Sequence, residues 1–248
     1  MSEQCGCAAL ILAAGEGTRM KSSLAKVLHA VAGKSMIRHV LETVQAVSPS
    51  RIVIVIGHQA EAVRRELDGE RVEFVIQEPR LGTGHAALMA EWSFGGFAGR
   101  IVVLNGDTPL LRPRTLESLV AFHRGESASA TVLSAEIDDP AGYGRIVRDG
   151  RGAFLRITEH KDANDSVRAI REINSGIFCF ESVDLFGALK KVGRRNVQGE
   201  YYITDVMEIL RGAGKRVVVY RCDQREEVLG INTVEQLQAA ERLMKKDG

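Results

Sequence analysis

Cysteine is scarce in this sequence and does not occur in a paired pattern. The 248 residues contain only Cys5, Cys7, Cys179 and Cys222, which do not form a disulfide framework and which suit a reducing cytoplasm. Cys5-Gly6-Cys7 resembles half of a metal site, but no second cysteine–histidine pair stands at ligand spacing. We interpret these two thiols as part of a frayed N-terminal leader. A chain of this length can bury a stable core without disulfides.

Net charge and long apolar runs are also lacking. The formal net charge of +1 argues against a nonspecific nucleic-acid-binding protein, which usually carries a clear basic excess. No stretch approaches the roughly 18 consecutive apolar residues of a membrane span. The apolar run Ala8–Ala14 has no basic segment before it and a polar loop after it, so it predicts a strand and not a signal peptide. We expect a cytoplasmic protein without nucleic-acid or membrane partners.

The sequence does contain a regular alternation of short apolar runs with amphipathic segments. In the first half the predicted strands are 8–13, 51–56, 72–76 and 101–104, and the predicted helices are 36–47, 60–67 and 82–92. This alternation is typical of βαβ units. It predicts an α/β fold of the Rossmann-like type, with a mostly parallel sheet and helices on both faces.

After Pro113 the pattern becomes looser. A helix to about residue 123 is followed by predicted strands 128–135, 144–147, 154–157, 173–180 and 216–220 and by predicted helices 184–191 and 201–210. These short strands predict a smaller β-rich lid on the sheet. No repeat, low-complexity tract or Pro/Ser-rich linker interrupts the chain. We therefore predict one domain over 1–248, with halves of about 1–135 and 136–230 and a returning helix in 231–248 that starts at the capping box Thr233–Gln236.

The Gly-rich loop after the first strand is the most informative segment. A buried strand that ends in Ala-Ala-Gly-x-Gly brings bare backbone to the carboxyl edge of a parallel sheet, where open α/β folds bind ligands. The loop is not a P-loop, since no Gly-Lys-Ser/Thr follows Gly15, and not a dinucleotide fingerprint, since Met20 replaces the third glycine. Arg19 and Lys26 beside the loop suit a triphosphate. Taken alone, the loop is equally compatible with a turn carrying solvated charges.

Several motifs together resemble one family. Residues 12–20 and 26–28 resemble the L-A-A-G-x-G-T-R-M…K-V-L signature of sugar-1-phosphate nucleotidylyltransferases. Seven more segments, in the same order, resemble the uridylyltransferase domain of the bacterial bifunctional N-acetylglucosamine-1-phosphate uridylyltransferases: 77–86, 106–110, 142–146, 159–163, 172–177, 198–205 and 230–232. The resemblance extends from about Ala8 to Arg242, nearly the whole chain.

The resemblance implies a GT-A-type fold and a reaction. The reaction is Mg²⁺-dependent transfer from UTP to N-acetylglucosamine-1-phosphate, which gives UDP-N-acetylglucosamine and pyrophosphate. The attacking phosphate oxygen is already an anion, so no general base is needed, and catalysis rests on positioning and charge neutralisation. By resemblance, Lys26 neutralises the α-phosphate and Arg19 holds the pyrophosphate. Asp107 is a catalytic residue and, with Asn232, a Mg²⁺ ligand.

The remaining contacts follow from the same resemblance. The implied nucleotide-binding residues, in the first half of the chain, are Leu12, Ala13, Ala14, Gly15, Gly17, Gln77, Gly82 and Thr83. The amide of Gln77 suits the donor and acceptor edge of uracil. The implied sugar-binding residues, in the second half, are Gly144, Glu159 and Asn174. Seen alone, Glu159 or Asn174 would be interpreted as a solvated polar residue.

The sequence also departs from the family pattern. Ala25 stands where the family usually has proline, Asn105 where it has tyrosine, and Leu229 where it has an acidic residue. We expect a less rigid loop and a looser substrate preference from the first two. Two alternatives therefore stay open: the same reaction on another sugar-1-phosphate, such as glucose-1-phosphate, or another nucleotide, and a catalytically silent paralogue that binds a nucleotide-sugar. The complete set Arg19, Lys26, Asp107 and Asn232 argues against the silent paralogue.

The expected assembly state follows from a missing repeat. Bifunctional members of the family carry a C-terminal left-handed β-helix with acetyltransferase activity, and this helix makes trimer contacts. This sequence contains no hexapeptide repeat. We expect only the nucleotidyl-transfer half, as a monomer or weak oligomer.

Overall fold

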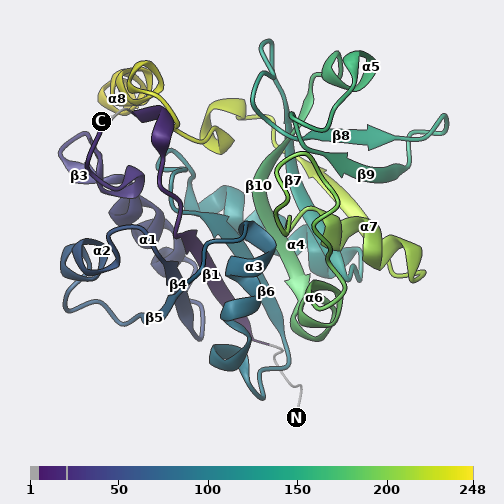
Figure 1. Cartoon of the computed structure of the whole chain (residues 1–248), viewed down its shortest axis with the longest axis horizontal. Helices are drawn as coiled ribbons and strands as arrows, with labels where there is room; N and C mark the ends of the chain where they lie inside the picture. Colours follow the sequence, from purple (N-terminus) through teal and green to yellow (C-terminus); the bar gives the residue numbers. More distant parts are fainter. Residues whose placement is uncertain (1–5, 21, 248) are drawn as a thin grey trace.

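The computed structural model describes residues 6–20 and 22–247, so Cys5 lies outside the described part of the chain (Figure 1). The strands are β1 (Cys7–Ala13), β2 (Ala30–Val31), β3 (Lys34–Ser35), β4 (Ile52–Ile56), β5 (Glu73–Ile76), β6 (Arg100–Asn105), β7 (Ala130–Glu136), β8 (Arg145–Arg148), β9 (Phe154–Thr158), β10 (Glu172–Glu181) and β11 (Val217–Arg221). The α-helices are α1 (Met36–Ala46), α2 (Ala60–Glu66), α3 (Thr83–Met89), α4 (Pro113–Gly125), α5 (Asp165–Arg168), α6 (Ser182–Leu189), α7 (Asp205–Gly212) and α8 (Val234–Asp247). Short 3₁₀ turns are η1 (Thr18–Met20), η2 (Lys26–Leu28), η3 (Glu91–Phe94) and η4 (Arg225–Val228).

One large sheet organises the molecule. Its strand order is β11-β7-β10-β6-β1-β4-β5, and β8 and β9 extend it from β10. The pairs β6–β1, β1–β4, β4–β5 and β7–β11 are parallel, whereas β10 runs antiparallel to both neighbours. The predicted Rossmann-like, mostly parallel sheet is confirmed. Parallel strands of this kind place their carboxyl ends, and the loops that follow them, at one edge.

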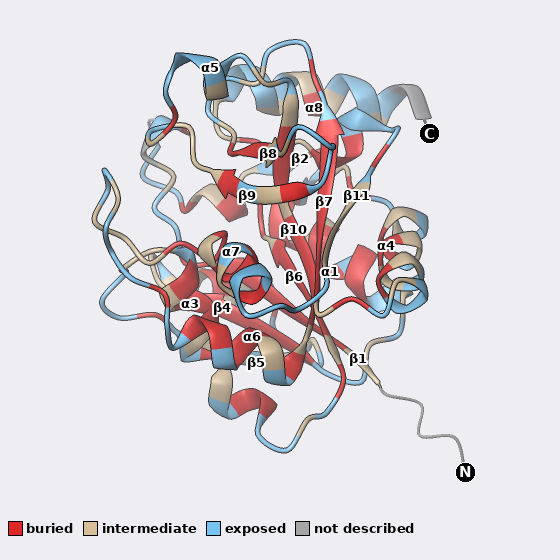
Figure 2. Ribbon diagram, turned by 90° about the vertical axis from the view of Figure 1, so that its right-hand side faces the viewer, coloured by how far each residue is buried: buried red, intermediate tan, exposed pale blue. Residues whose placement is uncertain are grey.

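Helices cover both faces of the sheet, as predicted. Side chains of a strand alternate between its faces, and β1 shows this directly. Leu10 belongs to the cluster that contains Leu185 of α6, while Ile11 belongs to the opposite cluster with Val40 of α1 and Leu119 of α4. Figure 2 shows the central strands of the sheet buried along most of their length and the outer faces of the helices exposed. Burying each such aliphatic side chain contributes about 1.5–3 kcal/mol, so the sheet is a rigid support for its loops.

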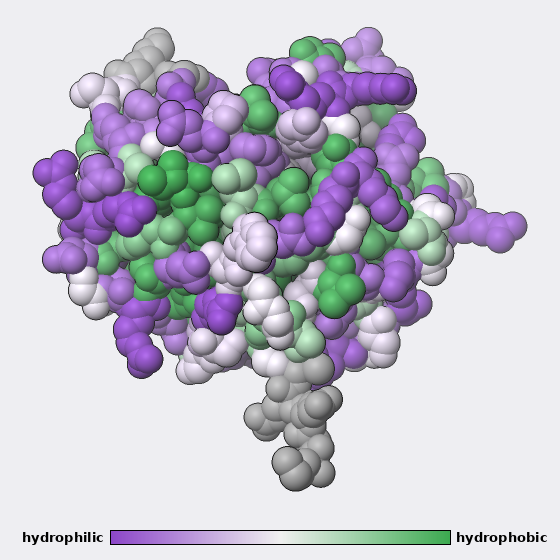
Figure 3. All heavy atoms as spheres, turned by 60° about the horizontal axis from the view of Figure 1, so that its bottom comes forward, coloured by the Kyte–Doolittle hydropathy of each residue, from purple (hydrophilic) through white to green (hydrophobic). Residues whose placement is uncertain are grey.

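The outer surface is mixed in character. On the face shown in Figure 3, hydrophilic residues alternate with smaller hydrophobic areas. No helix among residues 6–20 and 22–247 combines the length and the apolar character needed to cross a bilayer.

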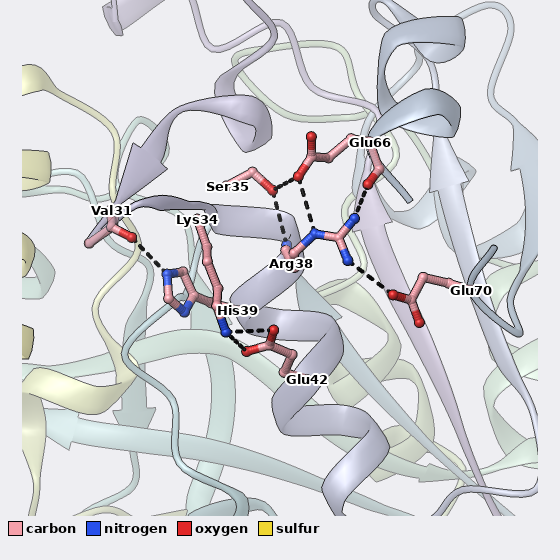
Figure 4. Close-up of polar contacts among 8 residues, drawn as sticks. All are labelled: Val31, Lys34, Ser35, Arg38, His39, Glu42, Glu66 and Glu70. Atoms are coloured by element: carbon pink, nitrogen blue, oxygen red, sulfur yellow. Dashed lines mark hydrogen bonds and ion pairs between the residues drawn. The ribbon is translucent and has the colours of Figure 1, made fainter. Parts of the chain in front are cut away.

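A polar network joins α1 to α2 (Figure 4). Ser35 caps α1 by accepting from the Arg38 amide at 3.4 Å, and its hydroxyl donates to Glu66 Oε1 at 2.7 Å. The Arg38 guanidinium donates to Glu66 Oε1 at 3.3 Å, to the Glu66 carbonyl oxygen, and to Glu70 Oε1 at 3.0 Å. The end of α2 is therefore held firmly against the start of α1.

The second half forms the expected β-rich extension. Figure 1 shows β8, β9 and α5 at the same end of the molecule as α8, away from the N-terminus. β8 pairs with β10 through Arg145 and Ile173, and the Asn174 amide donates to the Gly144 carbonyl oxygen at 2.9 Å. The division of the chain into two halves and a returning helix stays a prediction.

One predicted helix begins later than expected. The sequence pattern predicts a helix over 201–210, but α7 starts at Asp205. The backbone before α7 is hydrogen-bonded to another part of the chain. The Tyr201 amide donates to the Leu81 carbonyl oxygen at 2.8 Å, and the Gly84 amide donates to the Tyr201 carbonyl oxygen at 2.7 Å. Residues that pair with a distant loop cannot also supply the first turn of a helix.

The last helix begins with the predicted capping box. Thr233 Oγ1 accepts from the Gln236 amide at 3.3 Å, and Gln236 Oε1 accepts from the Thr233 amide at 3.2 Å. Gln236 Oε1 also accepts from the Asn232 amide at 2.7 Å. The cap satisfies the Gln236 amide in the first turn of α8 and fixes the backbone of Asn232 and Thr233.

Candidate active site

A cleft of about 580 Å³ lies at the carboxyl ends of β1 and β6, between the sheet and its β-rich extension. The predicted site residues that line it are Leu12, Ala13, Ala14, Gly15, Arg19, Lys26, Gly82, Thr83, Asp107, Gly144, Glu159, Asn174 and Asn232. Gly17 and Gln77 are not among the lining residues. The fold thus brings together groups that lie up to 220 positions apart in the chain, from Leu12 to Asn232 (232 − 12).

The centre of the cleft is a compact group of charged and polar side chains. The Lys26 ammonium forms an ion pair with Asp107 Oδ2 and donates to Asn232 Oδ1 at 3.1 Å. The Arg19 guanidinium donates to the same Asn232 oxygen at 2.7 Å. All four residues predicted for phosphate and metal binding are therefore in one place. Lys26 and Asp107 are mostly shielded from solvent, with side chains 17% and 11% exposed, which strengthens their interaction.

The backbone positions the two oxygen-bearing members of this group. Asp107 lies two residues after the end of β6, and its carbonyl oxygen accepts from the Ile231 amide at 2.9 Å. The Tyr143 hydroxyl donates to the Gly230 carbonyl oxygen at 3.3 Å. Burial, followed by the nearby Asp107 carboxylate, raises the pKa of Tyr143 to about 12, so this hydroxyl stays a donor. These bonds hold the segment before α8 beside the end of β6.

Asp107 and Asn232 fit a magnesium ion. Asp107 Oδ1 is buried and has no hydrogen-bond partner among the described residues. A buried carboxylate oxygen without a donor is costly, and a cation would satisfy it. A Cβ on Gly230 would lie 3.5 Å from both Asp107 oxygens and 3.6 Å from Asn232 Nδ2, so the glycine leaves this side open. In the described ranges no three His, Cys, Asp or Glu residues cluster at metal-binding distance. Mg²⁺ does not need such a cluster, because one or two protein oxygens together with substrate phosphates are enough to bind it.

Glycine at position 17 makes room for the lysine. Gly17 has a φ of +68°, and a Cβ there would collide with Lys26 Cβ. A left-handed glycine is therefore required for the Lys26 stem to pass beneath the loop. Contact between Gly17 and a nucleotide stays a prediction.

Gly82 and Thr83, at the start of α3, form one wall of the cleft, and this wall packs tightly against the segment before α7. Gly82 has a φ of +108°, and a Cβ there would lie 2.6 Å from the Tyr201 carbonyl oxygen. Thr83 Oγ1 accepts from the Ile203 amide at 3.1 Å. The loop before α3 is thus locked to the second half of the chain.

Gln77 lies behind this wall. Its side chain is buried, and Nε2 donates to the Gly82 carbonyl oxygen at 2.9 Å and to His85 Nδ1 at 3.1 Å. Burial lowers the pKa of His85, which favours the neutral ring that accepts this bond. The observed contacts make Gln77 a support for Gly82, and direct recognition of a base by Gln77 stays a prediction.

The three predicted sugar-binding residues lie together on the other wall. The Glu159 carboxylate accepts from Thr204 Oγ1 at 3.0 Å, and burial raises the pKa of Glu159. A Cβ on Gly144 would lie 3.3 Å from Glu159 Oε2. Asn174 is buried, and its Oδ1 accepts from the Gly176 amide at 2.9 Å. This wall offers an acceptor-rich, partly shielded surface that suits hydroxyl and amide groups.

Sequence reasoning missed several residues that line the cleft. Tyr143 and Thr204 lie inside segments that resemble the family, and this is the sequence signal by which they could have been found. Glu16 and Arg80, which form an ion pair at 2.8 Å, likewise lie inside the family-like segments 12–20 and 77–86. Asn105 lies against Gly176, and a Cβ at position 176 would collide with the side-chain amide of Asn105.

Residues 9–173 match the family described as MobA-like NTP transferase domain. The chain belongs to that family and is a nucleotidyltransferase.

Similar curated proteins are longer than this chain. The chain is 52% identical over 238 residues to the bifunctional protein GlmU of Halalkalibacterium halodurans, covering 96% of this chain and 52% of that protein. It is 48% identical to the bifunctional protein GlmU of Enterococcus faecalis, with the same coverage. The chain spans about half the length of the curated relatives it matches.

Solved structures share the fold at low identity. A UDP-glucose pyrophosphorylase complexed with UDP-glucose superimposes with a TM-score of 0.78 at 19% identity, covering 97% of this chain and 99% of that one. A Bacillus anthracis protein assigned as a glucose-1-phosphate thymidylyltransferase gives a TM-score of 0.75 at 22% identity, covering 96% and 94%. At these identities the likeness supports the fold.

Proposed function

We propose that this protein transfers the uridylyl group of UTP to N-acetylglucosamine-1-phosphate, with release of pyrophosphate. The observation that carries the proposal is the convergence of Arg19, Lys26, Asp107 and Asn232 at the base of a cleft beside a bare Gly-rich loop. The choice of UTP and N-acetylglucosamine-1-phosphate rests on the resemblance of the sequence motifs to bacterial bifunctional N-acetylglucosamine-1-phosphate uridylyltransferases. The curated relatives are about twice as long as this chain.

The reaction requires charge control and alignment. A phosphate oxygen of the sugar phosphate attacks the α-phosphorus and forms a new P–O bond. The bond from the α-phosphorus to the bridging oxygen breaks, and pyrophosphate leaves with that electron pair. No proton has to move, because the nucleophile is already ionised. Catalysis then depends on stabilising negative charge in a shielded site.

The chain supplies that stabilisation from two cations. Lys26 lies deeper in the cleft and would face the α-phosphate, while the exposed Arg19 would hold the outgoing pyrophosphate. Asp107 and Asn232 would hold Mg²⁺, which neutralises phosphate oxygens when bound. Ala14 and Gly15 line the same space, and their backbone amides would donate to phosphate oxygens there.

The opposite wall would orient the acceptor. Glu159 and Asn174 suit the hydroxyl groups and the N-acetyl group of the sugar. Because burial raises the pKa of Glu159, a hydrogen bond from a sugar hydroxyl would replace lost hydration. Gly144 leaves the space beside this carboxylate free of a side chain.

The test is pyrophosphate release from a panel of substrates. UTP, CTP, GTP and dTTP are each paired with N-acetylglucosamine-1-phosphate, glucose-1-phosphate and galactose-1-phosphate, with and without Mg²⁺. We expect the highest kcat/KM for UTP with N-acetylglucosamine-1-phosphate. A higher value for another pair would replace the substrate assignment, and release with no pair would favour a silent protein that binds a nucleotide-sugar.

A further inference from the structure

A short loop segment leads directly to Lys26. It comprises residues 23–25, it lies between η1 and η2, and Ala25 within it is buried at 1% exposure. The Ala25 amide donates to the side-chain Oε1 of Gln59 at 2.9 Å, and Gln59 Nε2 donates to the Ser23 carbonyl oxygen. The side-chain amide of Gln59 thus bonds to both ends of this segment.

Gln59 is itself fixed. It is the residue before α2, with a left-handed backbone (φ 51°, ψ 42°), and its carbonyl oxygen accepts from the Ala62 amide at 2.9 Å. The far end of α2 is tied to α1 through Glu66 and Arg38, as Figure 4 shows. The C-terminal end of α2 is thus anchored to α1, and Gln59 stands on the backbone that leads into this anchored helix.

The bond from Ala25 has a direct consequence for Lys26. A buried amide without a partner is costly, so residues 23–25 would shift toward solvent if Gln59 did not accept this bond. Lys26 follows immediately, and its ammonium reaches Asp107 and Asn232. A shift of about 1 Å in a group that must be aligned can lower a rate about 10²-fold.

We propose that Gln59 is a positioning residue for nucleotidyl transfer, which fixes the position of Lys26 through the backbone of residues 23–25. The inference rests on the proposed function for the role of Lys26. Gln59 does not line the cleft, so it acts on the reaction only through this backbone.

Proline at position 25 supplies a sharp test. Ala25 has a φ of −54° and a ψ of 136°, which a proline ring can adopt. Proline has no amide hydrogen, so the variant Ala25→Pro removes the donor that Gln59 satisfies and also restrains the backbone. If Gln59 acts as inferred, Ala25→Pro should make Gln59 dispensable.

The experiment compares wild type, Gln59→Ala, Ala25→Pro and the double variant. We expect Gln59→Ala to lower kcat about 10- to 100-fold, with KM for both substrates within about twofold and little change in Tm. Ala25→Pro alone should be nearly as active as wild type, and the double variant should recover most of the lost rate. Gln45→Ala is the matched control, because Gln45 of α1 makes an exposed bond to Glu70, beyond the end of α2, at 2.9 Å and does not line the cleft.

Hydrogen exchange gives a readout that does not depend on activity. The Leu28 amide donates to the Ala25 carbonyl oxygen at 2.9 Å, so Gln59→Ala should speed exchange at Leu28 while the sheet amides keep their protection. This measurement decides the matter if Ala25→Pro proves inactive or unfolded by itself.

Three results would overturn the inference. They are a wild-type kcat in Gln59→Ala, a loss of kcat that accompanies faster exchange throughout the molecule, and a double variant that stays as slow as Gln59→Ala while Ala25→Pro is active. If wild type releases no pyrophosphate, the proposed function fails. Exchange at Leu28 then decides separately whether Gln59 holds the loop.

Discussion

Lys26 is the single residue on which the chemistry depends most. Its ammonium lies between Asp107 and Asn232 at the floor of the cleft. We predict that Lys26→Ala lowers kcat about 10²- to 10³-fold, the usual cost of losing one preorganised charge-stabilising group. The measurement is steady-state pyrophosphate release. Lys34→Ala, which removes an exposed ion pair with Glu42, is the control and should leave the rate unchanged; a similar rate in both variants would refute the role of Lys26.

Asp205 gives a prediction about pH. Burial, assisted by the carboxylates of Glu208 and Asp162, raises the pKa of Asp205 from 3.8 to about 6. The folded state therefore binds a proton more tightly than the unfolded state, so this group's contribution to stability is full below about pH 4 and is lost as pH rises to about 6. The loss amounts to at most about 3 kcal/mol.

The variant Asp205→Asn removes this titration. We predict that its stability relative to wild type increases between pH 4 and pH 6 and then becomes constant. Urea unfolding at pH 4, 5, 6 and 7.5 measures the difference. A relative stability that declines over this range would show that the Asp205 carboxylate is favoured in the fold.

At the scale of elements, Gly82 joins α3 to the segment before α7. A Cβ at this position would lie 2.6 Å from the Tyr201 carbonyl oxygen. We predict that Gly82→Ala destabilises the protein by about 2–4 kcal/mol, from backbone strain and overpacking together, and raises KM for the nucleotide. Gly33→Ala is the matched control, because Gly33 also has a positive φ of +84° but has open space around it. Equal losses in the two variants would contradict the packing argument.

The start of α8 connects helix capping to metal binding. Gln236 accepts from the amides of Asn232 and Thr233. We predict that Gln236→Ala lowers stability by about 1 kcal/mol and raises the Mg²⁺ concentration needed for half-maximal rate, because Asn232 loses its backbone restraint. Gln238→Ala changes an exposed glutamine of the same helix and should do neither. Thermal unfolding and a Mg²⁺ titration measure both effects.

Local patterns predicted most elements but not their partners. The buried run of β1 and the capping box of α8 were readable because each depends on neighbouring residues. The start of α7 was not, since Tyr201 pairs with Leu81 and Gly84, more than 100 positions away. The pairing of Gln59 with Ala25 was also unreadable, because it depends on how α2 is placed against the loop.

At the scale of the whole molecule, the sheet explains which site residues could be predicted. Strand order places the ends of β1 and β6 side by side, and for this reason the Gly-rich loop and Asp107, which follow these strands, meet in one cleft. Asn232 could be assigned only by resemblance, because the bond from Ile231 to Asp107 that brings it there leaves no sequence pattern. The buried position of Gln77 likewise depends on packing behind Gly82.

The whole account depends on one reaction centre formed by Lys26, Asp107 and Asn232. The most direct test measures pyrophosphate release from UTP and N-acetylglucosamine-1-phosphate by wild type and Asp107→Asn, first with divalent cations removed and then with Mg²⁺ restored. The account predicts release by wild type only with Mg²⁺, and a rate at least about 10²-fold lower for Asp107→Asn. Full release by wild type without a divalent cation, or an unchanged rate in Asp107→Asn, would contradict it.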